Sequence, residues 1–341
     1  MTAFLWLACT AKDLPPHTGE SDDSAFVDTR TEWEKVGDSF GVMTTIAGKG
    51  DIPTKGYDGW DDSYEGGDPL DAELSRPHMT MSDAAGVLYI ADKDAHAIRA
   101  IEGGVISTLV DTGLSSPNGL WAQPDGTLYI HDMGNNRIAK RTPAGEVSTF
   151  FELPSSGTGR GLWVSPDADL AYISCGSTLR KWTVDEGVST LATGFSSLGN
   201  VAVDPDGLVV ATDRGGHKVT RIEADGSKTV IAGNGTTSGG GDGDLAVDVG
   251  LAQVRGIWFH PLGGYFLATH EGGQLGYVDT DGVWHLMLDG DDEHSHGGDD
   301  EHWSTPGKKL SEPRAVVMNA HGDLVITEND AGFIRMIEAL E

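Results

Sequence analysis

The stretch PNGLWAQPDGTLYIHDMGNNRIAKRTPAGEVSTF, residues 117–150, decides the fold. The unit that begins there holds short runs of strand-forming residues, GLWAQ, TLYIHD, RIAKRTP and EVSTFFE, separated by turn signals such as PDG. Comparable units begin at residues 77, 117, 159, 198, 254 and 313. Four-stranded units of about forty residues are typical of propeller blades. The sequence therefore predicts an all-β chain, a six-bladed β-propeller of four-stranded antiparallel blades.

The two ends of the chain are expected to meet in one blade. The last unit ends with its third strand at Ile337–Glu341, and no fourth strand follows. Residues 42–47, VMTTIA, match fourth-strand sequences such as VISTLV, yet no blade precedes them. Closing the ring with this N-terminal strand leaves no open sheet edge. We therefore expect residues 41–341 to form the propeller.

Three further runs carry a resemblance to a known family. They are LYIAD followed by AIR (88–99), LYIHDMGNNRI (128–138) and VIAGNGTTSGGGDGDLAVDVGLAQ (230–253). Together they resemble the NHL-repeat propellers and, more distantly, gluconolactonase-like and TolB-like propellers. The resemblance implies that links from the outer strand of one blade to the inner strand of the next share one face. Three of these links are long and are expected around half of one channel mouth: 48–76, 233–253 and 289–312.

Composition excludes several partners. The chain of 341 residues carries 53 acidic and 23 basic residues, a formal net charge of −30. Nucleic acid is excluded, because its binding depends on Lys and Arg displacing counterions. An anionic membrane surface would be repelled as well. No apolar run is long enough for a spanning helix, and Cys9 and Cys175 do not resemble a disulfide framework.

The N-terminus resembles a bacterial lipoprotein signal. Phe4 to Ala8 is a short apolar stretch that ends in a small residue before Cys9, the expected lipidation site. Residues 1–9 would be the signal remnant and residues 10–40 a polar tether, which places the protein at a bacterial cell envelope. Membrane contact would then occur only through the lipid anchor. The alternative is a frayed N-terminus with a chance cysteine.

Aligning the units gives the residue at the entry of each inner strand. The expected ligand-binding residues among them are His78, Asn118, Arg160, Arg255 and Arg314. Arginine offers a planar fork for carboxylate or phosphate, so the mouth could hold a small anion or an acidic peptide end. The alternative is structural: Arg314 pairs with Glu328, while Arg160 and Arg255 pair with acids of the long links.

The link DGDDEHSHGGDDEHW, residues 289–303, is a candidate cation loop. Its carboxylates suit Ca²⁺ and its histidines suit Zn²⁺. The candidate ligands are Asp291, Asp292, Glu293, His294, His296, Asp299, Asp300 and His302. No fixed ligand spacing is present, so the alternative is a solvated acidic loop. No other cofactor is expected.

Two functions stay open at this stage. The first is a non-catalytic, envelope-anchored NHL-type propeller, expected to be a monomer, that binds a protein or small anionic ligand on the linker-bearing face. The second is a metal-dependent lyase or lactonase-like hydrolase in the central channel. Resemblance to peptidyl-hydroxyglycine lyases implies a zinc held by histidines, for which His78, His131 and His270 are the candidates. The recurrent Trp121, Trp163 and Trp258 are expected to fill the core between blades.

Overall fold

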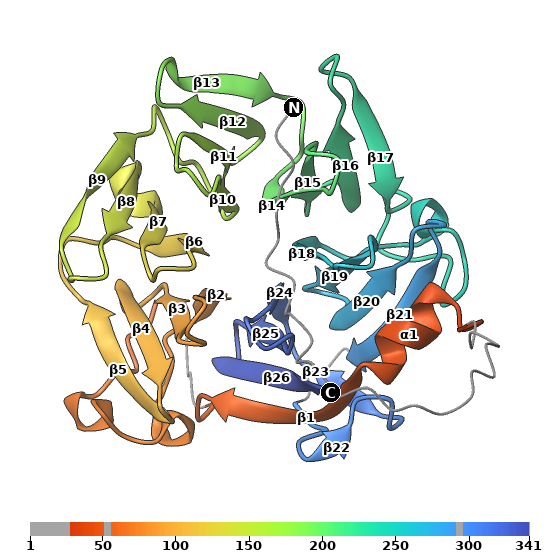
Figure 1. Cartoon of the computed structure of the whole chain (residues 1–341), viewed down its shortest axis with the longest axis horizontal. Coiled ribbons are helices and arrows are strands. Elements are labelled where there is room, and N and C mark those ends of the chain that lie inside the picture. Colours follow the sequence, from red (N-terminus) through yellow and green to blue (C-terminus); the bar gives the residue numbers. More distant parts are fainter. Residues whose placement is uncertain (1–27, 51–55, 291–295, 341) are drawn as a thin grey trace, which may run out of the picture.

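Six β-sheets surround one axis in the computed structural model of the protein (Figure 1). The structure describes residues 28–50, 56–290 and 296–340. Within these ranges it contains 26 strands and one α-helix, and no helix there is both long and apolar enough to span a bilayer. The predicted six-bladed propeller of four-stranded antiparallel blades is confirmed.

The first three blades follow one another along the chain, each running from its inner to its outer strand. Blade one contains β2 (Pro77–Ser82), β3 (Leu88–Asp92), β4 (Ala97–Glu102) and β5 (Val105–Val110). Blade two contains β6 (Pro117–Ala122), β7 (Leu128–Asp132), β8 (Arg137–Arg141) and β9 (Val147–Glu152). Blade three contains β10 (Leu162–Val164), β11 (Leu170–Cys175), β12 (Thr178–Thr183) and β13 (Gly187–Ala192).

The other three blades include the extra strands. Blade four contains β14 (Leu198–Val203), β15 (Val209–Asp213), β16 (Lys218–Ile222) and β17 (Lys228–Ala232). Blade five contains β18 (Val254–Phe259), β19 (Tyr265–Thr269), β20 (Gln274–Val278), β21 (Trp284–Gly290) and β23 (Lys308–Leu310). Blade six contains β24 (Pro313–Met318), β25 (Leu324–Glu328), β26 (Phe333–Ala339), β1 (Phe40–Ala47) and β22 (Glu301–His302).

Burial explains why the second strands read as continuous apolar runs. β7, with the sequence LYIHD, is buried at every position, because both of its faces pack against neighbouring blades. The outer strand β9 is mostly exposed and carries Ser and Thr instead. The antiparallel register places Trp121 opposite Tyr129 and Tyr129 opposite Lys140. Each blade is therefore apolar toward the ring and polar at its rim.

The N-terminal strand closes the ring, as predicted. β1 pairs antiparallel with β26, with Met43 opposite Ile337 and Thr44 opposite Met336. Figure 1 shows β1 beside β26, so that strands from the two terminal parts of the chain meet in this blade. β22 then pairs with the outer side of β1. This pairing satisfies edge backbone groups that would otherwise be free.

Most of the described part of the link 289–312 does not follow the predicted path beside the channel. Its described part supplies β22 at the outside of blade six and β23, which runs parallel to the end of β21 in blade five. The two strands of the link therefore lie at the periphery of the ring, whereas its last residue, Glu312, comes within 3.6 Å of His270 Nε2 near the channel. The prediction was wrong for this part because the unpaired backbone groups at the edges of β1 and β21 form hydrogen bonds with the link. The spacing of the repeats carries no information about these edges.

A short helix precedes the propeller. α1 (Glu32–Asp38) begins with a capping box formed by Thr31 and Glu34. Glu32 accepts a hydrogen bond from Tyr277 Oη at 2.5 Å, and Trp33 stacks on His285 with ring centroids 4.9 Å apart. Glu32 and Trp33 thus hold α1 on blade five, so the folded part begins before residue 41. Cys9 and residues 10–27 of the predicted tether lie outside the described residues.

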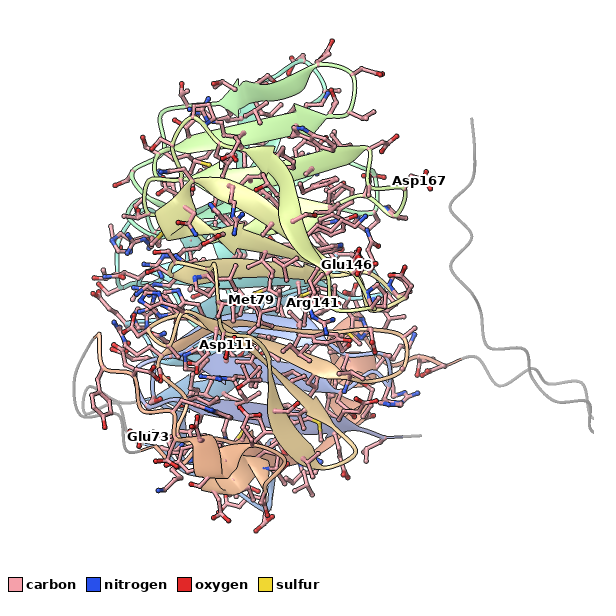
Figure 2. All side chains as sticks on the ribbon, turned by 90° about the vertical axis from the view of Figure 1, so that its left-hand side faces the viewer. Glu73, Met79, Asp111, Arg141, Glu146 and Asp167 are labelled. Atoms are coloured by element: carbon pink, nitrogen blue, oxygen red, sulfur yellow. The ribbon has the colours of Figure 1, made fainter. Side chains whose placement is uncertain are left out.

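Short 3₁₀ turns shape the links of one face. They are η1 (Asp62–Tyr64), η2 (Pro69–Asp71), η3 (Met133–Asn135) and η4 (Ala246–Asp248). Figure 2 views the ring from the side and separates Glu73, in the first long link, from Glu146 and Asp167, in turns on the opposite side. The link-bearing side is the one on which each inner strand begins. It is called the entry face below.

Tryptophans pack between neighbouring blades and also reach the axis itself. Trp121 of blade two and Trp258 of blade five belong to opposite blades, yet their ring centroids are 6.3 Å apart. Trp163 lies 5.9 Å from Trp121. The predicted role as filler between blades is confirmed, since Trp121 packs against residues of blades two and three and Trp258 against residues of blades five and six. The inner strands also converge on the axis, so their long side chains meet there as well. The channel below the entry face is therefore occupied by protein.

Candidate functional site

The entry positions of the inner strands bring a group of polar side chains to the axis. His78, Asn118, Arg255 and Arg314 are the second residues of their inner strands, and Arg160 comes just before β10. Except for the half-buried Arg160, each is at most 6% exposed. His270 follows β19 and contacts Arg314. We call this set the axial cluster: His78, Asn118, Arg160, Arg255, His270 and Arg314.

The axial arginines are not neutralised as the structural alternative expected. Arg314 lies 3.5 Å from Asp330, and Glu328 instead pairs with Arg335 at 2.9 Å. The expected Arg314–Glu328 pair was wrong, because Glu328 points toward the third strand of its own blade. Within the described ranges Arg160 and Arg255 form no ion pair of 4.0 Å or less.

Several buried donors of the axial cluster have no acceptor within the described part of the chain. They are Nε and Nη1 of Arg160, Nε and Nη1 of Arg255, and Nε of Arg314. Arg255 uses Nη2 to donate to Gln253 Oε1 at 2.6 Å, which fixes the direction of its guanidinium. Most buried polar groups of folded proteins are hydrogen-bonded, so a concentration of unpaired guanidinium donors indicates a place for acceptor oxygens.

The axial cluster carries an unfavourable concentration of positive charge. Burial and the neighbouring Arg160 lower the pKa of Arg255 to about 8. Burial, followed by repulsion from Arg314, lowers the pKa of Arg160 well below the usual range. Burial, followed by repulsion from Arg255, does the same to the pKa of Arg314. A guanidinium resists deprotonation. The charged arginines therefore repel one another, and a bound anion would relieve this repulsion.

His78 and Asn118 form a defined pair across blades one and two. Asn118 Nδ2 donates to the carbonyl oxygen of Gly159 at 2.8 Å, so Asn118 Oδ1 is the atom that faces His78 Nδ1. His78 Nδ1 must then carry the hydrogen. Burial, with repulsion from Arg314, lowers the pKa of His78 well below its usual value, which keeps the ring neutral. His78 Nε2 is buried without a partner in the described chain.

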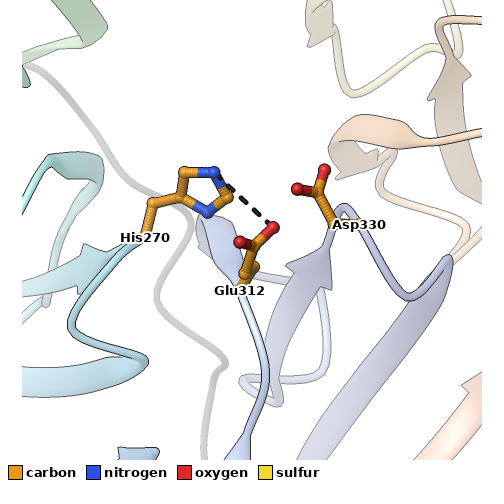
Figure 3. Close-up of side chains that lie close together, drawn as sticks. All are labelled: His270, Glu312 and Asp330. Carbon is orange, nitrogen blue, oxygen red and sulfur yellow. Dashed lines mark ion pairs between the residues drawn. The ribbon is translucent and has the colours of Figure 1, made fainter. Parts of the chain in front are cut away.

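An acidic pair borders the cluster on blade six (Figure 3). Glu312 precedes β24 and lies 3.6 Å from His270 Nε2, while Asp330 follows β25. Burial and a hydrogen bond with Asp330 raise the pKa of Glu312 to about 8. Burial alone would raise the pKa of Asp330, but hydrogen bonds with Glu312 and Arg76 outweigh it and lower the pKa. At neutral pH this pair therefore shares one proton and holds one negative charge.

Sequence reasoning missed Glu312 and Asp330. Both lie just outside the repeated strand runs, in the segments SEPR (311–314) and TEND (327–330). The sequence did contain a signal for Glu312, because this acid lies two residues before Arg314, the entry residue of its blade. No other unit carries an acid two residues before its entry residue. An alignment of repeats compares what the units share, and it therefore passes over an acid that occurs in one unit alone.

His270, Glu312 and Asp330 are the one group of three potential metal ligands found among the described residues. Their ligand atoms lie within 4.8 Å of one another. Arg314 donates toward His270 Nε2 at 3.4 Å, and Asp330 is shared with Arg76 and Arg314. These cations therefore already contact His270 and Asp330, and their positive charge would oppose a dication.

The three-histidine zinc arrangement is not formed by the described residues. His131 is fully buried between blades two and three, with both ring nitrogens unpartnered there, and it joins neither His78 nor His270 in a ligand group. The amide of Asn118 is already committed to His78 and Gly159, so it is not free to bind a metal in the channel.

The candidate cation loop is only partly described. Asp291, Asp292, Glu293 and His294 lie outside the described residues. His296 stacks on Phe333 with ring centroids 3.8 Å apart, and Asp299 pairs with Arg335 at 3.1 Å. Asp300 and His302 are exposed. None of these four described residues belongs to a group of three ligand atoms in the described chain, and the cation site stays a prediction.

Comparison with known proteins establishes the fold alone. No family model matches the chain, and no curated protein sequence does. A protein of unknown function from Bacteroides thetaiotaomicron has a TM-score of 0.73 and 16% identity, covering 88% of this chain and 76% of that chain. An auxiliary nutrient binding protein from the same species has a TM-score of 0.67 and 14% identity, covering 88% and 77%. Streptogramin B lyase has a TM-score of 0.57 and 15% identity, covering 80% and 96%. The class is thus the six-bladed propeller.

Proposed function

We propose that the protein is a non-catalytic NHL-type propeller that binds a small anionic ligand at the axial cluster. The observation that carries this proposal is the convergence of Arg160, Arg255 and Arg314 from three blades, with buried guanidinium donors that have no acceptor in the described chain. Arginine donors in a low-dielectric setting bind carboxylate or phosphate oxygens strongly. The nutrient-binding propellers of similar fold are consistent with a ligand-binding role.

A small ligand fits these donors better than a protein partner does. The unpaired nitrogens are inaccessible to solvent, so a large acidic surface could not reach them without displacing backbone. A small anion needs only the three guanidinium groups to move apart, which their side-chain torsions allow. The rigid ring holds their Cα positions during this movement. The entry face therefore favours the small-anion form of the prediction over the protein-partner form.

The experiment that tests this function is calorimetric titration of the protein with phosphate, sulfate and short dicarboxylates at fixed ionic strength. We expect saturable binding of at least one of these anions. Replacing Arg160 by Gln should weaken it by at least about tenfold, since one charge-assisted hydrogen bond contributes roughly 1.5–3 kcal/mol. Arg221→Gln is the matched control, because Arg221 pairs with Glu223 away from the axis. Equal affinity in both variants would contradict the proposal.

The cell-envelope location is part of the proposal. Cys9 follows the short apolar stretch Phe4 to Ala8, and structurally similar propellers are known from Bacteroides. Mass spectrometry of protein expressed with its native N-terminus in a bacterium that processes lipoproteins tests it. A diacylglyceryl mass on Cys9, lost in Cys9→Ser, is the expected result. An unmodified N-terminal methionine peptide would contradict it.

A metal-dependent lyase or lactonase-like hydrolase is the second candidate function. The observation that favours it is the group His270, Glu312 and Asp330. Its test is metal content after dialysis, with Zn²⁺, Ca²⁺ and EDTA compared. One retained equivalent of metal, lost in His270→Ala, would support this function. A metal-free protein that binds anions would contradict it.

A further inference from the structure

The axial cluster offers a hydrogen-bond acceptor among its donors. The amide of Asn118 is oriented by the carbonyl oxygen of Gly159, which can only accept, so Asn118 Oδ1 faces His78. A carboxamide oxygen cannot donate, and His78 Nδ1 therefore supplies the hydrogen. In the neutral ring the remaining nitrogen, Nε2, has a lone pair and no hydrogen. The two hydrogen bonds therefore identify the tautomer of His78: the Gly159 carbonyl orients the Asn118 amide, and Asn118 Oδ1 accepts from His78 Nδ1.

The position of this acceptor relates it to the guanidinium donors. His78 lies at the entry position of blade one, and Arg314 of blade six and Arg160 of blade three are near enough to disfavour its protonated form and lower its pKa. The side of its ring that carries Nδ1 is turned to Asn118 in blade two. Nε2 is buried and has no donor partner in the described chain, although guanidinium donors surround the same axis. No neighbouring guanidinium of the described residues donates a hydrogen bond to the lone pair of His78 Nε2. We take this as an indication that a group of the ligand donates to it.

His270 presents a hydrogen-bond donor, whereas His78 presents an acceptor. Arg314 Nη2 donates toward His270 Nε2 at 3.4 Å, which leaves the ring hydrogen on Nδ1. His270 Nδ1 is buried and unpartnered within the described residues. It therefore adds a neutral donor to those of the arginines. The cluster combines several donors with a single bare acceptor, His78 Nε2.

We propose, building on the anion-binding function above, that the ligand is a small anion that also carries a hydroxyl group, and that His78 Nε2 accepts the hydrogen bond of that hydroxyl. The arginines take the carboxylate or phosphate oxygens, and His78 selects for the hydroxyl. A buried site built to hydrogen-bond a hydroxyl rejects the analogue that lacks it, because its polar group is then left unpaired. The ligand class is a hydroxycarboxylate or the phosphate ester of a polyol.

Matched pairs of anions test this inference by calorimetry on the full chain. Malate against succinate differs by a hydroxyl on a dicarboxylate, and glycerol phosphate against propyl phosphate differs by hydroxyls on a phosphate ester. We expect the hydroxylated member of at least one pair to bind at least about tenfold more tightly. The pair that binds identifies the charged group as carboxylate or phosphate.

The variant His78→Phe keeps the ring but removes the acceptor. It should bring the two members of the preferred pair to equal affinity, whereas Arg160→Gln should weaken both members together. The exposed His321→Phe is the matched control and should keep the wild-type ratio. A ratio near one in the wild type, or an unchanged ratio in His78→Phe, would overturn the inference while leaving anion binding intact. Absence of binding by every anion, sulfate included, would instead overturn the proposed function.

A second measurement avoids dependence on the folding of His78→Phe. Nitrogen NMR of histidine-labelled wild-type protein reports the protonation of each ring nitrogen. The Nε2 signal of His78 should be that of an unprotonated nitrogen and should shift with the hydroxylated ligand but not with its partner. A protonated Nε2 in the free protein would overturn the inference directly.

Discussion

Arg335 and Glu328 form an ion pair in blade six that is fully removed from solvent. Arg335 also donates to the carbonyl oxygen of Gly297 at 2.8 Å and to Asp299 at 3.1 Å. The repeat alignment placed Glu328 at the channel mouth with Arg314, because it compares positions along strands and not side-chain directions. The pair instead fastens the link 296–312 to the closing blade.

Replacing Arg335 by Met should be strongly destabilising. Glu328 would keep its hydrogen bond from Ser311 N but lose the arginine that balances its buried charge, and removing one partner of a buried pair costs about 3–5 kcal/mol. Urea unfolding followed by circular dichroism measures this difference. The control is Arg221→Met, which breaks the partly exposed pair with Glu223 and should cost less than about 1 kcal/mol. A loss below about 1 kcal/mol for Arg335→Met would contradict the assigned role.

His131 makes the fold sensitive to acid. Burial lowers the pKa of His131 to about 4, below the value near 6.5 of the unfolded chain. A lowered histidine pKa means that the unfolded state binds the proton first, so stability falls as pH drops below 6.5 and levels off near 4. Between pH 7 and pH 5 this histidine should remove about 2 kcal/mol.

The measurement is urea unfolding at pH 7 and pH 5 for the wild type and His131→Leu. The variant should lose about 2 kcal/mol less than the wild type over that interval, while the exposed His321→Leu should follow the wild type. An identical pH dependence in His131→Leu and the wild type would show that His131 does not titrate in this window.

At the scale of the elements, inner strands of neighbouring blades approach closely where they begin, because glycine stands there in two blades. Gly119 and Gly161 each follow an entry residue of the axial cluster. A Cβ on Gly119 would lie 2.4 Å from the carbonyl oxygen of Arg160, and one on Gly161 would lie 2.4 Å from the backbone nitrogen of Val201. Neighbouring inner strands therefore approach backbone to backbone. This closeness brings the entry side chains of separate blades to one axis.

Gly161→Ala should separate blades three and four and lower the free energy of unfolding by about 1–3 kcal/mol, the usual cost of overpacking. Gly241→Ala is the control, because a Cβ added there would meet no atom within 4 Å. Thermal unfolding by calorimetry compares both with the wild type. Anion affinity should fall in Gly161→Ala as well, and an unchanged midpoint would contradict the close approach.

For the whole molecule, the features that recur in every blade could be predicted from the sequence. Turn signals and strand runs report local hydrogen bonding, so blade number, strand order and ring closure through residues 42–47 were predictable. The entry arginines were also predictable, because they occupy one repeat position. The order of the ring then brings side chains from distant units together, as with Trp121 and Trp258 across the axis.

The rest depended on features that do not repeat. Glu312 is an acid that its unit alone carries two residues before the entry position, and α1 packs through aromatic contacts that no spacing encodes. The path of the link 289–312 follows the unpaired edges of β1 and β21. Such contacts are decided by the assembled ring. They cannot be read from one unit at a time.

The central claim is that the arginines of the axial cluster hold an anion on the propeller axis. The most direct measurement is a crystal structure of the protein soaked in selenate, whose anomalous scattering locates the anion without reference to its shape. We predict one strong anomalous peak on the axis at the entry face, within hydrogen-bond distance of Arg160, Arg255 and Arg314, and its loss in Arg160→Gln. Selenate only at scattered surface lysines, with an empty axis, would contradict the account.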